Sequence, residues 1–205
     1  MAAFVSPDSS LPDMTLVTRI SLEPVLKWAQ RALLAGAILS LGYCCFITAD
    51  AWMFQHREQT QIKSVAAPNA LPAIGPDGLV GRIEILRLGL SVAVIEGTGE
   101  RALERAAGHV EGTALPGQPG NVGIAGHRDT FFRPLRNIHR NDVITVTTSR
   151  GQFRYRVVST KVVSPDDVAV LNSDGNEILT LVTCYPFYFV GPAPSRFVVR
   201  AARVI

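Results

Sequence analysis

The chain has 205 residues, of which 47% are hydrophobic and 18% are charged, and its formal net charge is +3. The mean hydropathy of +0.22 is high for a soluble domain of this size, so we expect part of the apolar content to lie in a membrane. The length allows one domain with its own core and a short extra segment. The mild, dispersed positive charge gives no indication of nucleic acid as a partner.

An apolar segment near the N-terminus is long enough to cross a membrane. Residues 32–49 contain no charged side chain, and the apolar character continues to residue 54. A helix of about 20 apolar residues spans the hydrocarbon core of a bilayer. Trp28 and Trp52 bracket the run, as aromatic residues do at the two membrane interfaces. The sequence therefore predicts a transmembrane anchor over residues 32–54.

The charges that flank this anchor predict its orientation. Lys27 and Arg31 lie just before it, and basic residues favour the cytoplasmic side. We therefore expect residues 1–31 in the cytoplasm and the rest of the chain outside. One alternative is a cleaved signal peptide, because residues 49–51 have a small-x-small pattern, although the preceding polar segment is long for one. The other is a buried core helix, which the length of the uncharged run disfavours.

The remainder of the chain divides into a linker and a β-rich domain. Residues 55–78 contain Pro68, Pro72 and Pro76, which predicts an extended extracytoplasmic linker. Residues 79–205 are expected to form the main domain, with a short helix at 101–108. Alternating or densely apolar segments predict strands at 82–86, 91–95, 121–125, 142–148, 152–163, 177–183 and 197–205. About eight short strands and one small helix predict a mainly β fold, a closed or nearly closed barrel.

The chain has three cysteines, which neither form a disulfide framework nor fit a zinc site. Cys44 and Cys45 are adjacent within the anchor, and Cys184 stands alone. No metal-ligand cluster stands out, so no cofactor is expected. Cys184 lies where an apolar strand ends and a proline-rich loop begins. Such a position can present a side chain to a cleft from a rigid backbone. It fits a nucleophile, or else a small residue that caps the barrel.

A thiol with its ordinary pKa near 8.5 needs a base or a positive field to act as a nucleophile at neutral pH. His127 follows the predicted strand 121–125, and Arg196 begins the last strand. In a barrel, strand ends can converge at one rim. An imidazole there can take the thiol proton and return it to a leaving amine, and a guanidinium can stabilise an oxyanion. His109 is the other candidate base.

Neighbouring residues offer further candidates for substrate contacts. Thr183 is a candidate oxyanion donor through its backbone or hydroxyl, with an ordinary strand threonine as the alternative. Tyr185 and the aromatic residues that follow it could wall a groove, although packing at the barrel edge explains them nearly as well. Arg128 belongs to a basic segment that is interpreted as a solvated face. Asp129 is interpreted as a solvated turn residue.

The motifs around these residues resemble those of a known family. Residues 120–128 read Gly-Asn-Val-Gly-Ile-Ala-Gly-His-Arg, residues 180–184 read Thr-Leu-Val-Thr-Cys, and Arg196 follows. In order and spacing they resemble the sortase signature. Residues 127–132 and 185–187 look most like class D sortases. The resemblance covers about residues 79–205.

The resemblance implies an eight-stranded sortase barrel and a transpeptidase activity. Such an enzyme would cleave an LPxT-type sorting motif near the C-terminus of a substrate protein, form a thioester, and pass the acyl group to an amine of a cell-wall peptide or a protein lysine. It implies Cys184 as the nucleophile, His127 as the general acid/base, and Arg196 as the group that orients substrate and binds the oxyanion. A membrane anchor fits an enzyme at the outer face of the cytoplasmic membrane.

Two other interpretations stay open from the sequence. Cysteine L,D-transpeptidases, which act on peptidoglycan, also combine a β-rich fold with a Cys/His pair. Their nucleophile usually lies in a His-Gly-Cys-x-Arg motif, whereas Thr183 precedes Cys184 here and Arg196 lies 12 residues further on. The third interpretation is a non-catalytic, membrane-anchored domain that binds a partner in the cell envelope.

Overall fold

The computed structural model describes residues 22–64 and 74–204. The chain divides into two compact units, Met1–Cys45 and Phe46–Ile205. The first contains most of a long helix, and the second contains the end of that helix and a β-barrel. The expected cytoplasmic segment falls largely on residues 1–21, which lie outside the described residues.

The long helix α1 (Leu22–Ser64) contains the predicted anchor. Its apolar stretch, Glu23–Gln55, is long enough to cross a membrane, and the rest of the chain buries none of its most apolar window. The helix continues to Ser64, although the linker was expected to begin at residue 55. Residues 55–64 contain no proline or glycine and are rich in good helix formers such as glutamine, glutamate and lysine. Pro68 and Pro72 lie outside the described residues.

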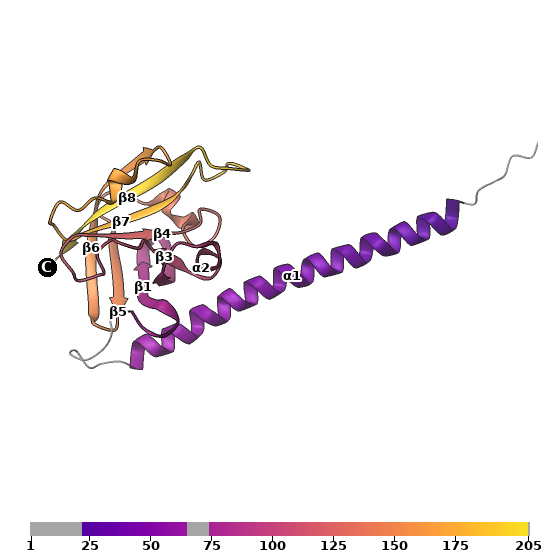
Figure 1. The fold of residues 1–205 in the computed structure, drawn as a ribbon, viewed down its shortest axis with the longest axis horizontal. Coiled ribbons are helices and arrows are strands. Elements are labelled where there is room, and N and C mark those ends of the chain that lie inside the picture. Colours follow the sequence, from indigo (N-terminus) through magenta and orange to yellow (C-terminus); the bar gives the residue numbers. More distant parts are fainter. Residues whose placement is uncertain (1–21, 65–73, 205) are drawn as a thin grey trace, which may run out of the picture. The chain divides into compact units, whose positions relative to one another are not determined.

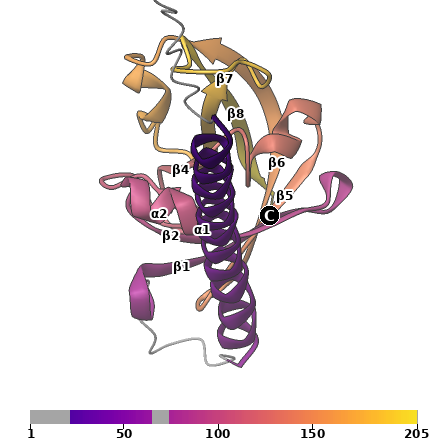
Figure 2. The ribbon, with the colours of Figure 1, turned by 90° about the vertical axis from the view of Figure 1, so that its right-hand side faces the viewer.

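Eight strands close into a barrel, as the sequence predicted. Around the barrel their order is β1-β2-β3-β4-β7-β8-β6-β5. The β2–β3 and β4–β7 pairs are parallel and the other pairs are antiparallel. In both Figure 1 and Figure 2, β7 and β8 lie together in orange to yellow. Figure 2 shows β2 and α2 together in magenta on another part of the wall. The strands are β1 (Leu79–Ile85), β2 (Leu90–Glu96), β3 (Ala107–His109), β4 (Asn121–Ala125), β5 (Val143–Thr148), β6 (Gly151–Val163), β7 (Ile178–Tyr185) and β8 (Ser195–Val204).

Short helices occupy the connections between the strands. One is α-helical and four are 3-10 helices within the described residues. They are α2 (Glu100–Arg105), η1 (Pro76–Gly78), η2 (Leu86–Leu88), η3 (Arg133–Asn137) and η4 (Val168–Leu171).

The barrel interior holds the hydrophobic core. Alternate residues of each strand face inward, and the inward set includes Ile124 on β4, Leu179 and Leu181 on β7, and Val199 on β8. All four are fully buried. Burying one such side chain stabilises the fold by about 1.5–3 kcal/mol. The core thereby fixes which residues of each strand face outward.

The strand β3 was missed by the sequence analysis, which extended a helix from residue 101 to residue 108. The helix α2 ends at Arg105, and β3 pairs in parallel with β2 and antiparallel with β4. Gly108 is the central residue of β3. A Cβ at this position would collide with the carbonyl oxygen of Gly97, so glycine is needed for the close approach. A three-residue strand after an alanine-rich helix gives little periodic signal.

The last turns of α1 that the structure describes in full belong to the barrel unit. The ring of Phe54 packs on a small cluster formed by Leu79, Ala93, Ile95 and Ala106. These aliphatic residues come from β1, β2 and the segment before β3. The helix therefore contacts the barrel wall at Phe54, just before the position where the linker was expected to begin, and continues past this contact to Ser64.

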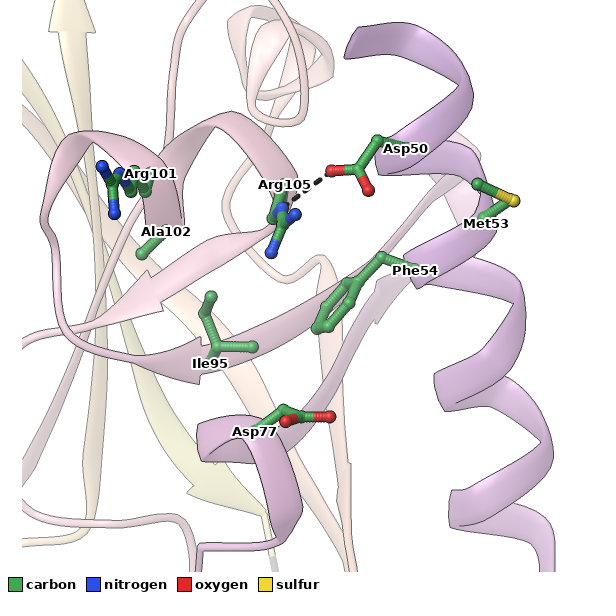
Figure 3. Close-up of a pocket in the computed structure, with 8 residues that line it drawn as sticks. All are labelled: Asp50, Met53, Phe54, Asp77, Ile95, Arg101, Ala102 and Arg105. Atoms are coloured by element: carbon green, nitrogen blue, oxygen red, sulfur yellow. Dashed lines mark hydrogen bonds and ion pairs between the residues drawn. The ribbon is translucent and has the colours of Figure 1, made fainter. Parts of the chain in front are cut away.

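Polar contacts accompany this packing. The Asp50 carboxylate accepts a hydrogen bond from Arg105 Nε at 2.8 Å. The Gln55 side chain accepts from the Ala93 N–H at 2.7 Å and donates to the Arg105 carbonyl at 3.0 Å. Figure 3 shows the pocket beside these contacts, with Asp50 and Arg105 joined across it. Because two acidic and two basic residues line the pocket, their charges balance.

Candidate active site

Cys184 lies in β7, one residue before the strand ends. Leu179 and Leu181 face the core, and the alternation of a strand puts Thr183 on their side and Cys184 on the outer side. Burial agrees, since Thr183 is 3% exposed and Cys184 is half-buried. The candidate nucleophile therefore lies on the outer face of the barrel and is partly open to solvent.

His127 lies two residues beyond β4, the parallel neighbour of β7. Ala125 is the register partner of Val182, and the Gly126 N–H donates to the Val182 carbonyl at 3.1 Å. The same sequence offset separates His127 from Cys184, so continuing the register two residues beyond β4 predicts that the two residues are neighbours. Adjacent strands are about 4.8 Å apart. The histidine side chain is exposed.

Arg196 lies on the other side of Cys184. It is the second residue of β8 and the direct antiparallel partner of Cys184. Because Val199 faces the core, the alternation of β8 puts Arg196 on the outer face with its partner. Its Nη1 donates to the carbonyls of Ala193 at 3.3 Å and Ser195 at 3.1 Å.

Cys184 and Arg196 are paired across β7 and β8, and the continued β4–β7 register predicts that His127 extends this pair into one row across the outer face of the barrel, here called the catalytic row. The sequence analysis expected three strand ends to converge at a rim. The topology gives the reason, because β4, β7 and β8 are consecutive in the barrel. A base, a thiol and a fixed positive charge on one face form a set that can perform acyl transfer.

The comparisons with known proteins agree with this geometry. The family model described as the sortase domain matches residues 83–204. This chain belongs to the sortase family. The prediction of that family from the sequence, with its resemblance to class D, is confirmed.

Relatives of several sortase classes match the barrel. Sortase D of Bacillus subtilis strain 168 is 36% identical over 125 residues, which are 60% of this chain and 63% of that protein. Sortase SrtE1 of Streptomyces coelicolor is 34% identical over 169 residues, or 69% of this chain and 48% of that protein. The chain thus spans about half to two thirds of the length of these relatives.

Solved sortase structures share the fold. The Clostridium perfringens Sortase D5 transpeptidase superposes with a TM-score of 0.62 at 27% identity, over 76% of this chain and 99% of that chain. Sortase C1 of Streptococcus agalactiae superposes with a TM-score of 0.60 at 31% identity, over 67% of this chain and 73% of that chain. The eight-stranded sortase barrel predicted from the sequence is confirmed.

Thr183 and Tyr185, the candidate substrate-binding residues of this sortase, have structural partners. The Thr183 hydroxyl donates to the Gly126 carbonyl at 2.7 Å, and this uses its only proton. The Tyr185 ring stacks on Phe197 at 6.3 Å and meets Phe187 edge-on at 6.0 Å. Phe187 and Phe197 both pack against the core. These contacts favour the packing alternatives considered from the sequence.

His109, the other candidate base, is buried with partners at both ring nitrogens. Its Nδ1 lies 2.8 Å from a Glu96 carboxylate oxygen, and its Nε2 lies 3.0 Å from the Ala114 carbonyl oxygen and 3.1 Å from the Thr113 hydroxyl. The side chain is 2% exposed. It therefore connects β2 and β3 to the following loop and has no access to a substrate.

Arg128 is the functional candidate that the sequence analysis missed, because it was assigned to a solvated basic face. It is 7% exposed and donates to three carbonyls of the loop between β7 and β8. Asp129, predicted as a solvated turn residue, is 70% exposed and lies 3.4 Å from the Arg128 Nε. The sequence carries no periodic or compositional signal for this burial, only the position next to His127.

No group of three or more possible metal ligands occurs among the residues whose side chains the structure describes.

Proposed function

We propose that this sortase is a cysteine transpeptidase that cleaves an LPxT-type sorting motif near the C-terminus of substrate proteins and transfers the acyl group to an amine. The observation that carries this proposal is the catalytic row, in which Cys184 pairs with an arginine on β8 and lies next to the end of β4, which stops two residues before a histidine. The sortase barrel and the parallel β4–β7 pair support it.

In the first half-reaction, Cys184 Sγ attacks the carbonyl carbon of the scissile peptide bond and its proton passes to His127. The tetrahedral intermediate collapses when the C–N bond breaks, and His127 gives the proton to the departing amine. The acyl group stays on Cys184 as a thioester. Splitting the transfer in this way replaces one difficult step by two easier ones.

In the second half-reaction, the acceptor amine attacks the thioester carbonyl and His127 takes a proton from it. The C–S bond then breaks, the new amide is released, and the proton returns to Cys184. The acceptor is an amino group of a cell-wall peptide or of a protein lysine. A water molecule in place of the amine would give hydrolysis instead.

Arg196 supplies the positive charge for both half-reactions. An arginine carries five N–H donors, and the hydrogen bonds of Arg196 within the described structure use only Nη1. Nε and Nη2 can then donate to the oxyanion of the intermediate and to the substrate backbone. A hydrogen-bond donor aimed at a developing oxyanion typically raises the turnover number by a factor of about 10²–10³.

The apolar helix α1 supports a location at the outer face of the cytoplasmic membrane. Lys27 and Arg31 precede its uncharged run, which favours a cytoplasmic N-terminus and an extracytoplasmic barrel. A single-pass anchor would keep the enzyme close to substrate proteins that are themselves exported.

Transpeptidation by the full chain in detergent micelles tests the proposal. The chain is incubated with a panel of Leu-Pro-x-Thr peptides and triglycine, and products are identified by mass. We expect a triglycine adduct from the wild type, none from Cys184→Ala or His127→Ala, and a rate about 10²-fold lower for Arg196→Ala. Arg133→Ala, at an exposed position, is the control.

The same assay distinguishes the alternatives. If Cys184→Ala retained the activity, the proposal would be wrong. Turnover of a muropeptide with none of the sorting peptides would instead favour the L,D-transpeptidase interpretation. Folded wild-type protein that turns over neither substrate would favour the binding module.

A further inference from the structure

Arg128 has an unusual environment for a residue in an exposed, arginine-rich segment. Arg133, Arg136 and Arg140 are exposed, whereas Arg128 is only 7% exposed. Removing a guanidinium from water is costly unless polar groups replace the lost hydration. The partners of Arg128 therefore indicate what its burial stabilises.

Those partners are main-chain carbonyls of one loop. Arg128 Nη1 donates to the Pro186 carbonyl at 2.9 Å, and Nη2 donates to those of Phe189 at 2.7 Å and Gly191 at 3.1 Å. The guanidinium also lies 5.9 Å from the centre of the Phe189 ring, within range of a cation–π contact. The planar fork of arginine suits several fixed acceptors, which the single ammonium of lysine cannot match.

The loop itself, residues 186–194, is otherwise held by the packing of Phe187 on the core, by the hydrogen bond from Arg196 to the Ala193 carbonyl, and by Arg136, which lies 5.6 Å from the centre of the Tyr188 ring. Tyr188 is 76% exposed and Val190 is 96% exposed. Within the described structure, its one internal backbone hydrogen bond runs from the Phe189 N–H to the Pro186 carbonyl at 3.4 Å. Prolines at three of its nine positions have no N–H to donate. Arg128 therefore supplies most of the hydrogen bonds that hold this loop.

The loop and Arg128 together surround the catalytic row. The loop begins two residues after Cys184 and ends two residues before Arg196, and Arg128 directly follows His127. One side chain thus connects the segments that flank all three members of the row. Loops that hold a substrate must be fixed with respect to the reacting groups, since misplacement by about 1 Å can cost about 10²-fold in rate.

We propose that Arg128 is a positioning residue that clamps the loop 186–194 beside the catalytic row, so that the loop forms a fixed wall against which the sorting-motif peptide binds. This inference rests on the proposed function, because the wall matters only for a peptide substrate. Arg128 acts through the loop and does not touch the reacting atoms. It is therefore expected to affect binding of a long peptide more than the reactivity of the Cys184 thiol.

The test compares Arg128→Lys with the matched control Arg133→Lys in the full chain in detergent micelles. Hydrogen–deuterium exchange of the Phe189 N–H, which is hydrogen-bonded within the loop, is measured first, because it reports the clamp without any activity. For Arg128→Lys we expect exchange of this amide to be at least about tenfold faster, with exchange in β4 and β7 unchanged. Arg133→Lys should behave as the wild type does.

Two kinetic readouts follow. The KM for the sorting peptide should rise about tenfold in Arg128→Lys with a smaller change in kcat. Site-resolved alkylation of Cys184 by iodoacetamide, a reagent too small to need the loop, should keep the wild-type rate and pH profile. A purely structural role would lower the folded fraction and reduce both reactions equally.

Unchanged exchange in the loop, or an unchanged KM in an active enzyme, would overturn the inference. Equal losses of peptide turnover and of alkylation would overturn it too, because they would place the effect of Arg128 on the nucleophile or on the whole fold. Failure of the proposed function is distinguishable: the wild type would then leave the peptide intact, while faster exchange in Arg128→Lys would still report the clamp.

Discussion

At the scale of single residues, Thr183 connects two members of the catalytic row. Its hydroxyl donates to the carbonyl of Gly126, the residue before His127, at 2.7 Å. Thr183 itself precedes Cys184. The hydrogen bond thus joins the strand ends that carry the proposed base and the proposed nucleophile, and both partners are buried.

Replacing the Thr183 hydroxyl should weaken the connection between the ends of β4 and β7. In Thr183→Val the Gly126 carbonyl loses its donor, so we expect the free energy of unfolding to fall by about 1–2 kcal/mol. Peptide turnover should fall about tenfold because the base and nucleophile are held less firmly. Thr183→Ser keeps the hydroxyl and is the matched control. Equal activity of the two variants would refute a role for the hydrogen bond.

Asp142 stabilises the barrel in a different way, through its charge. The guanidinium of Arg87 hydrogen-bonds its carboxylate and lowers the pKa of that carboxyl. The backbone N–H of His139 donates to it at 2.7 Å and acts in the same direction. Because Asp142 binds a proton less readily in the folded state, the unfolded state takes up more protons in acid.

The stability from Asp142 should therefore depend on pH in one direction. It should be fully present above the ordinary carboxyl pKa of about 3.9 and be lost as the pH falls below that value. Asp142→Asn should lower the free energy of unfolding by about 1–3 kcal/mol at pH 7. The difference from wild type should shrink toward pH 3 in urea titrations. A difference in unfolding free energy that does not change with pH would contradict this prediction. Asp166→Asn, at an exposed position, is the control.

His127, Cys184 and Arg196 could be selected as candidate site residues from the sequence because each lies at or near the end of a predicted strand inside a specific motif, and their roles stay predictions. Arg128 could not be predicted in the same way. Its partners are main-chain carbonyls about 60 residues further along the chain. Every residue has such a carbonyl, so the residue types give no signal of this contact. The pairing of Thr183 with Gly126 is hidden for the same reason.

At the scale of elements, α1 is joined to the barrel through Gln55, which lies nine residues before the helix ends at Ser64. Its side chain accepts from Ala93 and donates to the Arg105 carbonyl, and its own carbonyl accepts from Arg82 at 2.6 Å. The parallel pairing of β2 with β3 begins at Val94, so the glutamine satisfies an N–H just beyond that pairing. A helix that was expected to give way to a linker at residue 55 instead contacts the barrel there and continues to Ser64.

Gln55→Ala should therefore destabilise the barrel. The Ala93 N–H is buried, and leaving such a donor without its partner costs about 1–3 kcal/mol. We expect the melting temperature of the full chain in micelles to fall by several degrees. Gln152→Ala, at an exposed position, is the control. A melting temperature equal to that of the control would contradict a structural role for Gln55.

Elements with strong periodicity were predicted well, and short ones were not. The strand predicted at 121–125 matches β4, and that at 152–163 differs from β6 by one residue. The strand β3 was absorbed into the predicted helix, since its register depends on the close approach of Gly108 to Gly97. The continuation of α1 past residue 55 was missed because the prolines nearby were given more weight than the helix-forming residues before them.

At the scale of the whole barrel, the strand order creates the catalytic row. The strands β4 and β7 are separated by β5 and β6 in the chain, yet they pair in parallel. β8 then pairs with the other edge of β7. The sequence predicts the class of the fold and the ends of the strands, but long-range pairing follows from closing the barrel around one core. Only that closure makes three distant residues neighbours.

The most direct test of the catalytic row is to trap the acyl-enzyme. The full chain in micelles is mixed with a Leu-Pro-x-Thr peptide without an amine acceptor, and its intact mass and digested fragments are measured. We predict that the mass increases by one acyl group, located on Cys184 and absent from Cys44 and Cys45, and that triglycine removes it. A folded wild type with no adduct on Cys184, or with an adduct that persists in Cys184→Ala, would contradict the account.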